Sequence, residues 1–123
     1  MIFDSDVLIW TLRGNETAAR VIEEDQARSV SIVSCMELFQ GARDKKELAA
    51  IRRFLLEFET LPLSEDIGYR ASIYMEEYAL KSGLQLADSL IAATAVQRLE
   101  TLCTGNLKHY RAIPELELRP FRS

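Results

Sequence analysis

The chain has 123 residues and no apolar run near the ~20 residues that a membrane span needs. Hydrophobic residues make up 48% and charged residues 28%, which is typical of a folded globular protein and excludes disorder as the default. A net charge of −4 excludes nucleic-acid binding by bulk charge alone. We expect one domain over residues 1–123 without a signal peptide, and, because Cys35 and Cys103 lack metal-ligand spacing, two reduced core thiols in a cytoplasmic protein.

Strand and helix patterns alternate along the chain without an internal repeat. The segment 2–9 begins as a strand and turns into a short helix at Asp6, for which Asp6 is the expected N-cap. Alternation with a period of two predicts strands, and apolar residues spaced by three and four predict helices. The other predicted segments are a helix at 15–26, a strand at 29–34, helices at 34–41 and 45–58, a strand at 60–63, helices at 64–81 and 86–99, and strands at 101–104 and 116–121.

Several polar residues have a purely local interpretation. Asn15 and Ser64 stand where helix N-caps are expected. The pattern Ser34-x-x-Glu37 fits a capping box, in which Glu37 would only satisfy the N-cap amide. Pro62 lies inside the short strand 60–63, which predicts that this strand is at an edge of the sheet.

The alternation of strands and helices predicts a mainly parallel sheet of about five strands with helices on both faces. In open sheets of this type, functional sites form at the carboxyl ends of the strands. The polar residues that we expect at this end are Asp4, Asp6, Glu37, Asp88 and Asn106. Local alternatives remain open, since the helix dipole favours an acid in a first turn and Asn is common in turns.

Asp4 is the hardest of these residues to explain structurally, because it interrupts an apolar strand without a basic neighbour in sequence. Two carboxylates about 4 Å apart repel by roughly 4 kcal/mol at an effective dielectric of 20. Convergence of Asp4, Glu37 and Asp88 would therefore require a cation, and all-oxygen ligands favour Mg²⁺ or Mn²⁺. Magnesium held by few carboxylates usually completes its shell with phosphate oxygens, which indicates phosphoryl-ester chemistry.

Four motifs occur in order along essentially the whole chain. They are Asp4-Ser5-Asp6-Val7-Leu8-Ile9, Glu37-Leu38-Phe39-Gln40-Gly41, Ala87-Asp88-Ser89-Leu90-Ile91-Ala92-Ala93 and Thr104-Gly105-Asn106-Leu107-Lys108-His109-Tyr110. In this order and spacing the chain resembles the PIN-domain ribonucleases, in particular the toxin subunits of VapBC-type toxin–antitoxin systems. The resemblance implies a three-layer α/β/α sandwich with a mainly parallel central sheet of about five strands.

The resemblance also implies a site. Asp4, Glu37 and Asp88 would be the catalytic acids that bind Mg²⁺ or Mn²⁺, with Glu37 either a ligand or the group that orients the attacking water. Asn106 would stand at the fourth catalytic position, where many relatives carry Asp, and a neutral amide attracts a second metal less. The side chains that would support the ligands by hydrogen bonds are Ser5, Asp6 and Thr104. His109 is more expected as a packed turn residue than as a substrate contact.

The function implied by the resemblance is a metal-dependent endoribonuclease toxin of a type II toxin–antitoxin module. Attack by an activated water would leave a 5′-phosphate and a 3′-hydroxyl on the RNA. The implied partners are the RNA, a second copy in a homodimer, and a cognate antitoxin whose C-terminal segment would block the acidic site. A run that includes Arg43, Lys45 and Lys46 could hold RNA phosphates, or it is a solvated helix face.

Two alternatives remain open at this stage. One is a non-catalytic PIN-like module that binds RNA or protein, an interpretation that Asn106 permits. The other is a haloacid-dehalogenase-type phosphatase, in which Asp4 would be a covalent nucleophile and Asp6 a general acid. That family needs a later Lys and a further acidic pair, whereas Lys108 is poorly placed and the turn after residue 104 supplies no pair.

Overall fold

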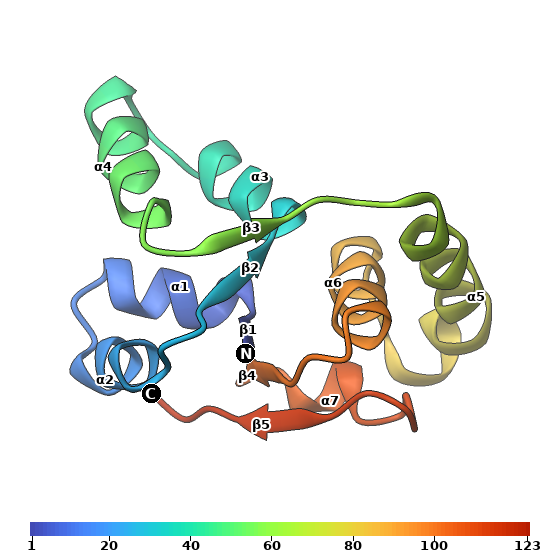
Figure 1. Cartoon of the computed structure of the whole chain (residues 1–123). Helices are drawn as coiled ribbons and strands as arrows, with labels where there is room; N and C mark the ends of the chain where they lie inside the picture. Colours follow the sequence, from blue (N-terminus) through green and yellow to red (C-terminus); the bar gives the residue numbers. More distant parts are fainter.

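The computed structural model describes all 123 residues as a five-stranded sheet between two layers of helices (Figure 1). The strand order is β3-β2-β1-β4-β5, and every neighbouring pair is parallel. The elements are β1 (Ile2–Phe3), α1 (Ser5–Leu12), α2 (Glu16–Glu24), β2 (Ser29–Ser31), α3 (Ile32–Gln40), α4 (Lys45–Leu55), β3 (Glu59–Leu61), α5 (Glu65–Ser82), α6 (Leu86–Gln97), β4 (Leu102–Thr104), α7 (Leu107–Tyr110) and β5 (Leu118–Pro120). The predicted parallel sheet with helices on both faces is confirmed.

Successive strand residues point to opposite faces of the sheet and build two cores. Ile2 and Leu102, which are partners in the β1–β4 register, pack with α5, α6 and α7. Phe3 and Cys103, the next pair along, pack with α1, α2 and α4 on the other face. Burial of each large apolar side chain contributes roughly 1.5–3 kcal/mol relative to exposure. The central strand β1 is therefore held from both sides at the point where Asp4 follows it.

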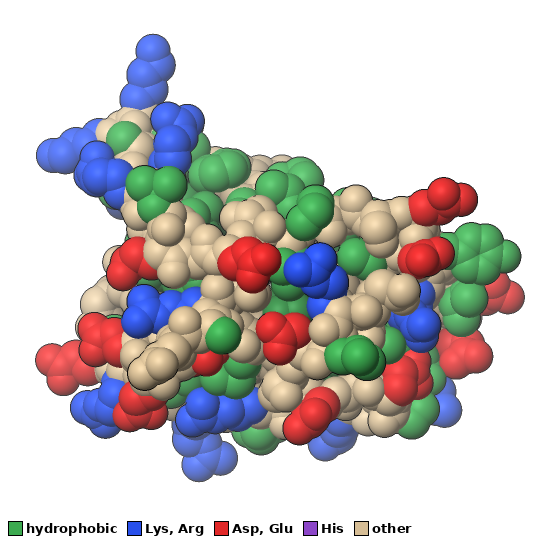
Figure 2. Space-filling view, viewed as in Figure 1, with side chains coloured by type: hydrophobic (Ala, Val, Ile, Leu, Met, Phe, Trp, Pro, Cys, Tyr) green, Lys and Arg blue, Asp and Glu red, His purple; other side chains and the backbone are tan.

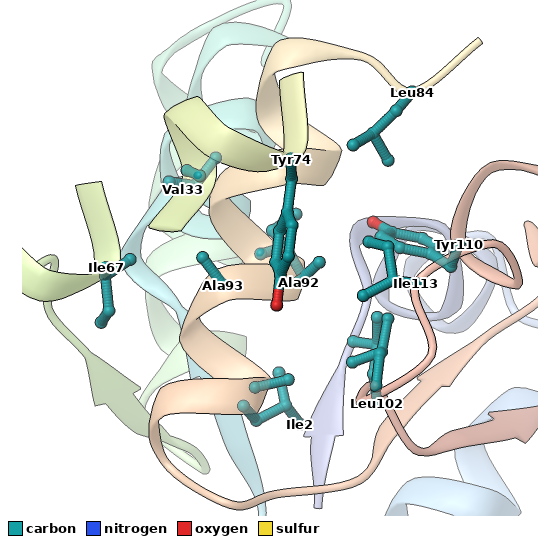
Figure 3. Close-up of a cluster of buried hydrophobic side chains, with 14 of the residues drawn as sticks. Ile2, Val33, Ile67, Tyr74, Leu84, Ala92, Ala93, Leu102, Tyr110 and Ile113 are labelled. Carbon is teal, nitrogen blue, oxygen red and sulfur yellow. The ribbon is translucent and has the colours of Figure 1, made fainter. Parts of the chain in front are cut away.

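Figure 3 shows the core under α5 and α6. One face of α5 is buried and packs into this core; it consists of Ile67, Ala71, Tyr74 and Tyr78. The small residues of α6, such as Ala92 and Ala93, are completely buried between α5 and the sheet. No helix in the structure is both long and apolar enough to cross a membrane.

Local signals predicted most helix starts correctly. Asn15 Oδ1 accepts a hydrogen bond from Ala18 N at 2.9 Å, and Ser64 Oγ accepts one from Ile67 N at 3.1 Å. Each such cap is worth about 1 kcal/mol. The strand β3 lies at an edge as predicted, and it ends before Pro62, so the missing amide proton costs no ladder hydrogen bond.

The predicted strand 29–34 and its helix cap at Ser34 are wrong. The strand ends at Ser31, whose Oγ accepts a hydrogen bond from Val33 N at 3.1 Å and begins α3 at Ile32. The β-branched residues Ile32 and Val33 favour a strand by propensity, but the cap and their packing override it. Ser34 lies inside α3, so the predicted capping box with Glu37 does not form.

The predicted start of the first helix is also wrong. β1 ends at Phe3, and Asp4 rather than Asp6 is the N-cap of α1, because Asp4 Oδ1 accepts a hydrogen bond from Ser5 N at 2.8 Å. Asp6 lies in the first turn of α1. The short helix α7 was not predicted, and the remaining boundaries lie within three residues of those observed.

Candidate active site

The adjacent carboxyl ends of β1 and β4 form the centre of the candidate site. Thr104, the last residue of β4, donates a hydrogen bond from Oγ1 to Asp4 Oδ2 at 2.8 Å. The other oxygen, Oδ1, accepts the hydrogen bond from Ser5 N. Asp4 is only 5% exposed, so both of its oxygens are oriented inside the protein.

Burial gives Asp4 an unusual acidity. Desolvation, with the negative charges of Asp6 and Asp88, raises the pKa of Asp4 from 3.8 to about 7, against the opposing effect of its hydrogen bonds. A buried carboxyl that also faces two other acids is a frequent feature of functional sites.

Asp88 reaches the same region from the start of α6. Its Oδ2 accepts a hydrogen bond from Gln85 N at 3.0 Å, and its Oδ1 accepts one from the Tyr110 hydroxyl at 3.2 Å. His109 Nδ1 lies 2.9 Å from Asp88 Oδ2 and 2.8 Å from the Asn106 side-chain amide nitrogen. Without a proton Nδ1 accepts from Asn106, and with one it donates to Asp88. Asn106 thus lies beside the acids and contacts Asp88 through His109.

Glu37 is exposed on α3 and is linked to the centre of the site by Ser5. Ser5 Oγ donates a hydrogen bond to Glu37 Oε1 at 2.6 Å and lies 2.9 Å from Ser34 Oγ. Because Ser5 N also donates to Asp4, one residue orients two of the predicted catalytic acids.

Asp6 ties the turn after β4 to α1. Its Oδ2 accepts a hydrogen bond from Gly105 N at 2.9 Å, and its Oδ1 accepts one from Val7 N at 2.8 Å. Burial raises the pKa of Asp6 despite these hydrogen bonds. The close approach favours a glycine, since a Cβ on Gly105 would lie 3.0 Å from Asp6 Oδ2 and 3.1 Å from the Phe121 carbonyl oxygen.

Replacement of Gly105 by alanine is expected to displace Asp6 or the chain at Phe121 and to lower the free energy of unfolding by about 1–3 kcal/mol. The matched control is Gly68→Ala on α5, where the new Cβ would meet no side chain and no other segment of the chain within 4 Å. There we expect a gain of about 0.5–1 kcal/mol, because alanine favours a helix. Urea unfolding of both variants measures the difference, and equal stability of Gly105→Ala and the wild type would contradict the steric argument.

The donor set fits a hard divalent cation in its chemistry. The four acids offer only oxygen ligands, none forms an ion pair with Lys or Arg, and His109 is their only basic contact. As the side chains lie, no three of Asp, Glu, His or Cys are arranged to bind one ion. Asp88 contacts His109 and Tyr110, whereas Glu37 contacts Ser5, so the acids lie against different neighbours.

The structure thus brings the sequence-predicted residues to one end of the sheet in two groups. One group contains Asp4, Asp6 and Glu37, and the other contains Asp88 and Asn106, which both contact His109. Asp4 and Asp6 contact the end of β4 directly, whereas Glu37 joins them through Ser5. Sequence reasoning missed the roles of Ser34 and Tyr110. Tyr110 was signalled only as the aromatic position that closes the last motif.

The predicted RNA contacts lie outside this end of the sheet, in an exposed basic cluster at α4 (Figure 2, upper left). The cluster consists of Arg43, Lys45, Lys46, Arg52 and Arg53. Arg43 pairs with Glu47 at 3.0 Å but is 86% exposed, so the pair leaves its charge largely available. A groove of about 590 Å³ is lined by both Glu37 of the site and Arg43 of the cluster.

Known proteins resemble this chain over most of its length. The family model described as PIN domain matches residues 1–113. The ribonuclease VapC19 of Mycobacterium tuberculosis is 29% identical over 121 residues, which cover 94% of this chain and 96% of that protein. The ribonuclease VapC1 of Methanocaldococcus jannaschii is 30% identical over 103 residues, which cover 81% of this chain and 74% of that protein. A chain of a toxin–antitoxin complex from Klebsiella pneumoniae superposes with a TM-score of 0.84 at 28% identity, covering 99% of this chain and 98% of that one.

Proposed function

The chain belongs to the PIN domain family, and on that premise we propose that it is a metal-dependent endoribonuclease, the toxin of a type II toxin–antitoxin module. Both curated relatives are named ribonucleases, and the similar Klebsiella pneumoniae chain is part of a toxin–antitoxin complex. The observation that carries the proposal is Asp4, a carboxyl that is 5% exposed, faces two further acids and has no basic partner. Such a group is stabilised by a cation.

Mg²⁺ or Mn²⁺ is the cofactor that we propose. Asp4 and Asp88 would hold it, with Glu37 as a further ligand or as the group that orients the attacking water. When bound, the cation supplies the charge that activates water and stabilises the negative charge that builds up on the phosphate oxygens. Asn106 adds no charge at the fourth position, which favours a single tightly held ion.

The residues around the acids prepare them for this role. Thr104 and the Ser5 amide fix the two oxygens of Asp4, and Ser5 Oγ fixes Glu37 at the rim of the groove. Mutation of hydrogen-bonded neighbours of this kind typically lowers metal affinity or activity by about 10–100-fold. The pre-oriented carboxylates therefore lose less freedom when they take up the ion.

RNA is the proposed substrate, and its flanking phosphates would lie along the groove toward Arg43, Lys45 and Lys46. Attack by water leaves a 5′-phosphate and a 3′-hydroxyl. A cognate antitoxin, a homodimer and a cytoplasmic location belong to the same proposal.

The phosphatase alternative is disfavoured by the surroundings of Asp6. Both of its oxygens accept hydrogen bonds from backbone amides, so neither is free to deliver a proton to a leaving group as a general acid. The non-catalytic alternative predicts RNA binding without cleavage.

Removal of divalent metal tests the proposal. We expect EDTA to reduce cleavage of a total transfer-RNA pool by about 100-fold or more, and we expect Mn²⁺ or Mg²⁺ to restore it. The ends of the fragments, read by phosphatase and ligase sensitivity, should be 5′-phosphate and 3′-hydroxyl. Cleavage that persists in EDTA would contradict the proposal, and binding without cleavage in Mn²⁺ would support the non-catalytic module.

A further inference from the structure

Tyr110 is a buried aromatic residue whose hydroxyl is directed at the acidic site. It lies on α7, between β4 and β5, and it is 0% exposed. Figure 3 shows its ring beside Ile113, within the core that includes Leu102. Burial of a phenol is costly unless its hydroxyl has a hydrogen-bond partner. The partner here is a carboxylate, not a backbone carbonyl.

The hydroxyl of Tyr110 contacts an acid that comes from another part of the fold. It donates to Asp88 Oδ1 at 3.2 Å, at the start of α6. Burial, the nearby charges of Asp4 and Asp88, and the hydrogen bond to Asp88 raise the pKa of Tyr110 well above 10.0. A phenol carries a single proton, and here that proton is donated to Asp88.

No other residue donates a hydrogen bond to Asp88 Oδ1. The second oxygen of Asp88 is engaged by Gln85 N and faces His109, and the oxygens of Asp4 are engaged by Ser5 N and Thr104. Without the phenol proton, Asp88 Oδ1 has no donor, and repulsion from Asp4 would turn the Asp88 carboxylate away. A phenylalanine would fill the same space in the core, so the hydroxyl is needed for the acids and not for packing.

We propose that Tyr110 is a positioning residue of the active site, whose hydroxyl orients the Asp88 carboxylate beside Asp4 for uptake of the divalent cation. The inference rests on the proposed function, because it concerns the same acids. It adds a residue that acts on the cation through its ligands and does not itself touch the substrate.

Tyr74 offers a matched control in the same core (Figure 3). It is 4% exposed, and its hydroxyl donates to Glu115, an acid outside the candidate site. Tyr110→Phe and Tyr74→Phe therefore each remove one buried hydroxyl that donates to a carboxylate. Only the first removes it from the proposed metal ligands.

The test measures Mn²⁺ binding to the full chain by electron paramagnetic resonance, together with kcat and KM for RNA cleavage. Tyr110→Phe is expected to weaken Mn²⁺ binding by about 10–100-fold and to lower kcat at fixed Mn²⁺, with KM unchanged within about twofold. Tyr74→Phe is expected to bind Mn²⁺ as the wild type does. Replacement of Tyr110 by 4-aminophenylalanine, which retains a donor, should restore most of the Mn²⁺ affinity.

Three outcomes would overturn the positioning role. They are wild-type Mn²⁺ affinity in Tyr110→Phe, an equal loss of affinity in Tyr74→Phe, and failure of 4-aminophenylalanine to restore binding. A lower thermal unfolding midpoint in Tyr110→Phe but not in Tyr74→Phe would mean that the hydroxyl serves stability, and this result would also count against the positioning role. If the wild type neither binds Mn²⁺ nor cleaves RNA, the proposed function itself fails. If the wild type does both and Tyr110→Phe behaves like it, only the positioning role of Tyr110 fails.

Discussion

Replacement of Asp4 by asparagine is expected to abolish RNA cleavage and, at the same time, to stabilise the protein at pH 8 in EDTA. The pKa of Asp4 is raised from 3.8 to about 7, mainly by burial. Between these values the folded state binds the proton more tightly than the unfolded state, so stability falls as the pH rises through this window. One pKa unit corresponds to about 1.4 kcal/mol, so the ionised carboxyl costs the folded protein on the order of 2–4 kcal/mol at pH 8.

Thermal unfolding in EDTA at several pH values measures this effect. The advantage of Asp4→Asn over the wild type should be largest at pH 8 and should shrink toward pH 4, where the wild-type carboxyl is neutral in the folded state. Mn²⁺ should raise the midpoint of the wild type more than that of the variant. Asp66→Asn, on the exposed first turn of α5, is the control and should show no gain. A variant that is less stable than the wild type at pH 8 would refute the electrostatic explanation.

Charge reversal of the α4 cluster should weaken RNA binding strongly. For the triple variant Arg43→Glu, Lys45→Glu and Lys46→Glu we expect a loss of roughly 10–100-fold at about 0.1 M salt. The three side chains are exposed, and the groove that Arg43 lines leads to Glu37. Each phosphate contact with a single strand contributes about 0.7 to the slope of log K against log salt, so the slope should fall by about 2.

Fluorescence anisotropy with a labelled single-stranded RNA measures both quantities, in the Asp4→Asn background so that the probe stays intact. A second triple variant provides the control, with glutamate at Arg20, Arg98 and Arg119, which are exposed outside α4. Each triple variant changes the net charge by −6, from −3 in the Asp4→Asn background to −9. Equal weakening by both sets would mean that bulk charge, and not the cluster, attracts the RNA.

The sequence alone predicted the features that depend on a few neighbouring residues. The caps at Asn15 and Ser64 are set by a side chain and an amide three positions later, and both were identified correctly. Apolar periodicity predicted the helix α5, and alternation of strands and helices predicted the parallel sheet. The acids could be assigned to one end of the sheet because the carboxyl ends of parallel strands share an edge.

The errors arose where two nearby residues competed for one local role. Asp4 and Asp6 are both good N-caps, as are Ser31 and Ser34. Sheet pairing decided between Asp4 and Asp6. Asp4 N still donates to the Cys103 carbonyl at 2.9 Å, so Asp4 directly follows the paired strand and its side chain caps α1. The sequence holds no record of where a strand stops pairing with a partner that lies far along the chain.

Tertiary structure alone decided the chemistry of the acids. The raised pKa of Asp4 comes from burial and from the nearby charges of Asp6 and Asp88. The link from Ser5 to Glu37 and the link from Tyr110 to Asp88 join residues that are distant in sequence. Residue types and their order were enough to predict which acids gather, whereas desolvation and hydrogen-bond geometry exist only once the chain is folded, and they determine how each acid behaves.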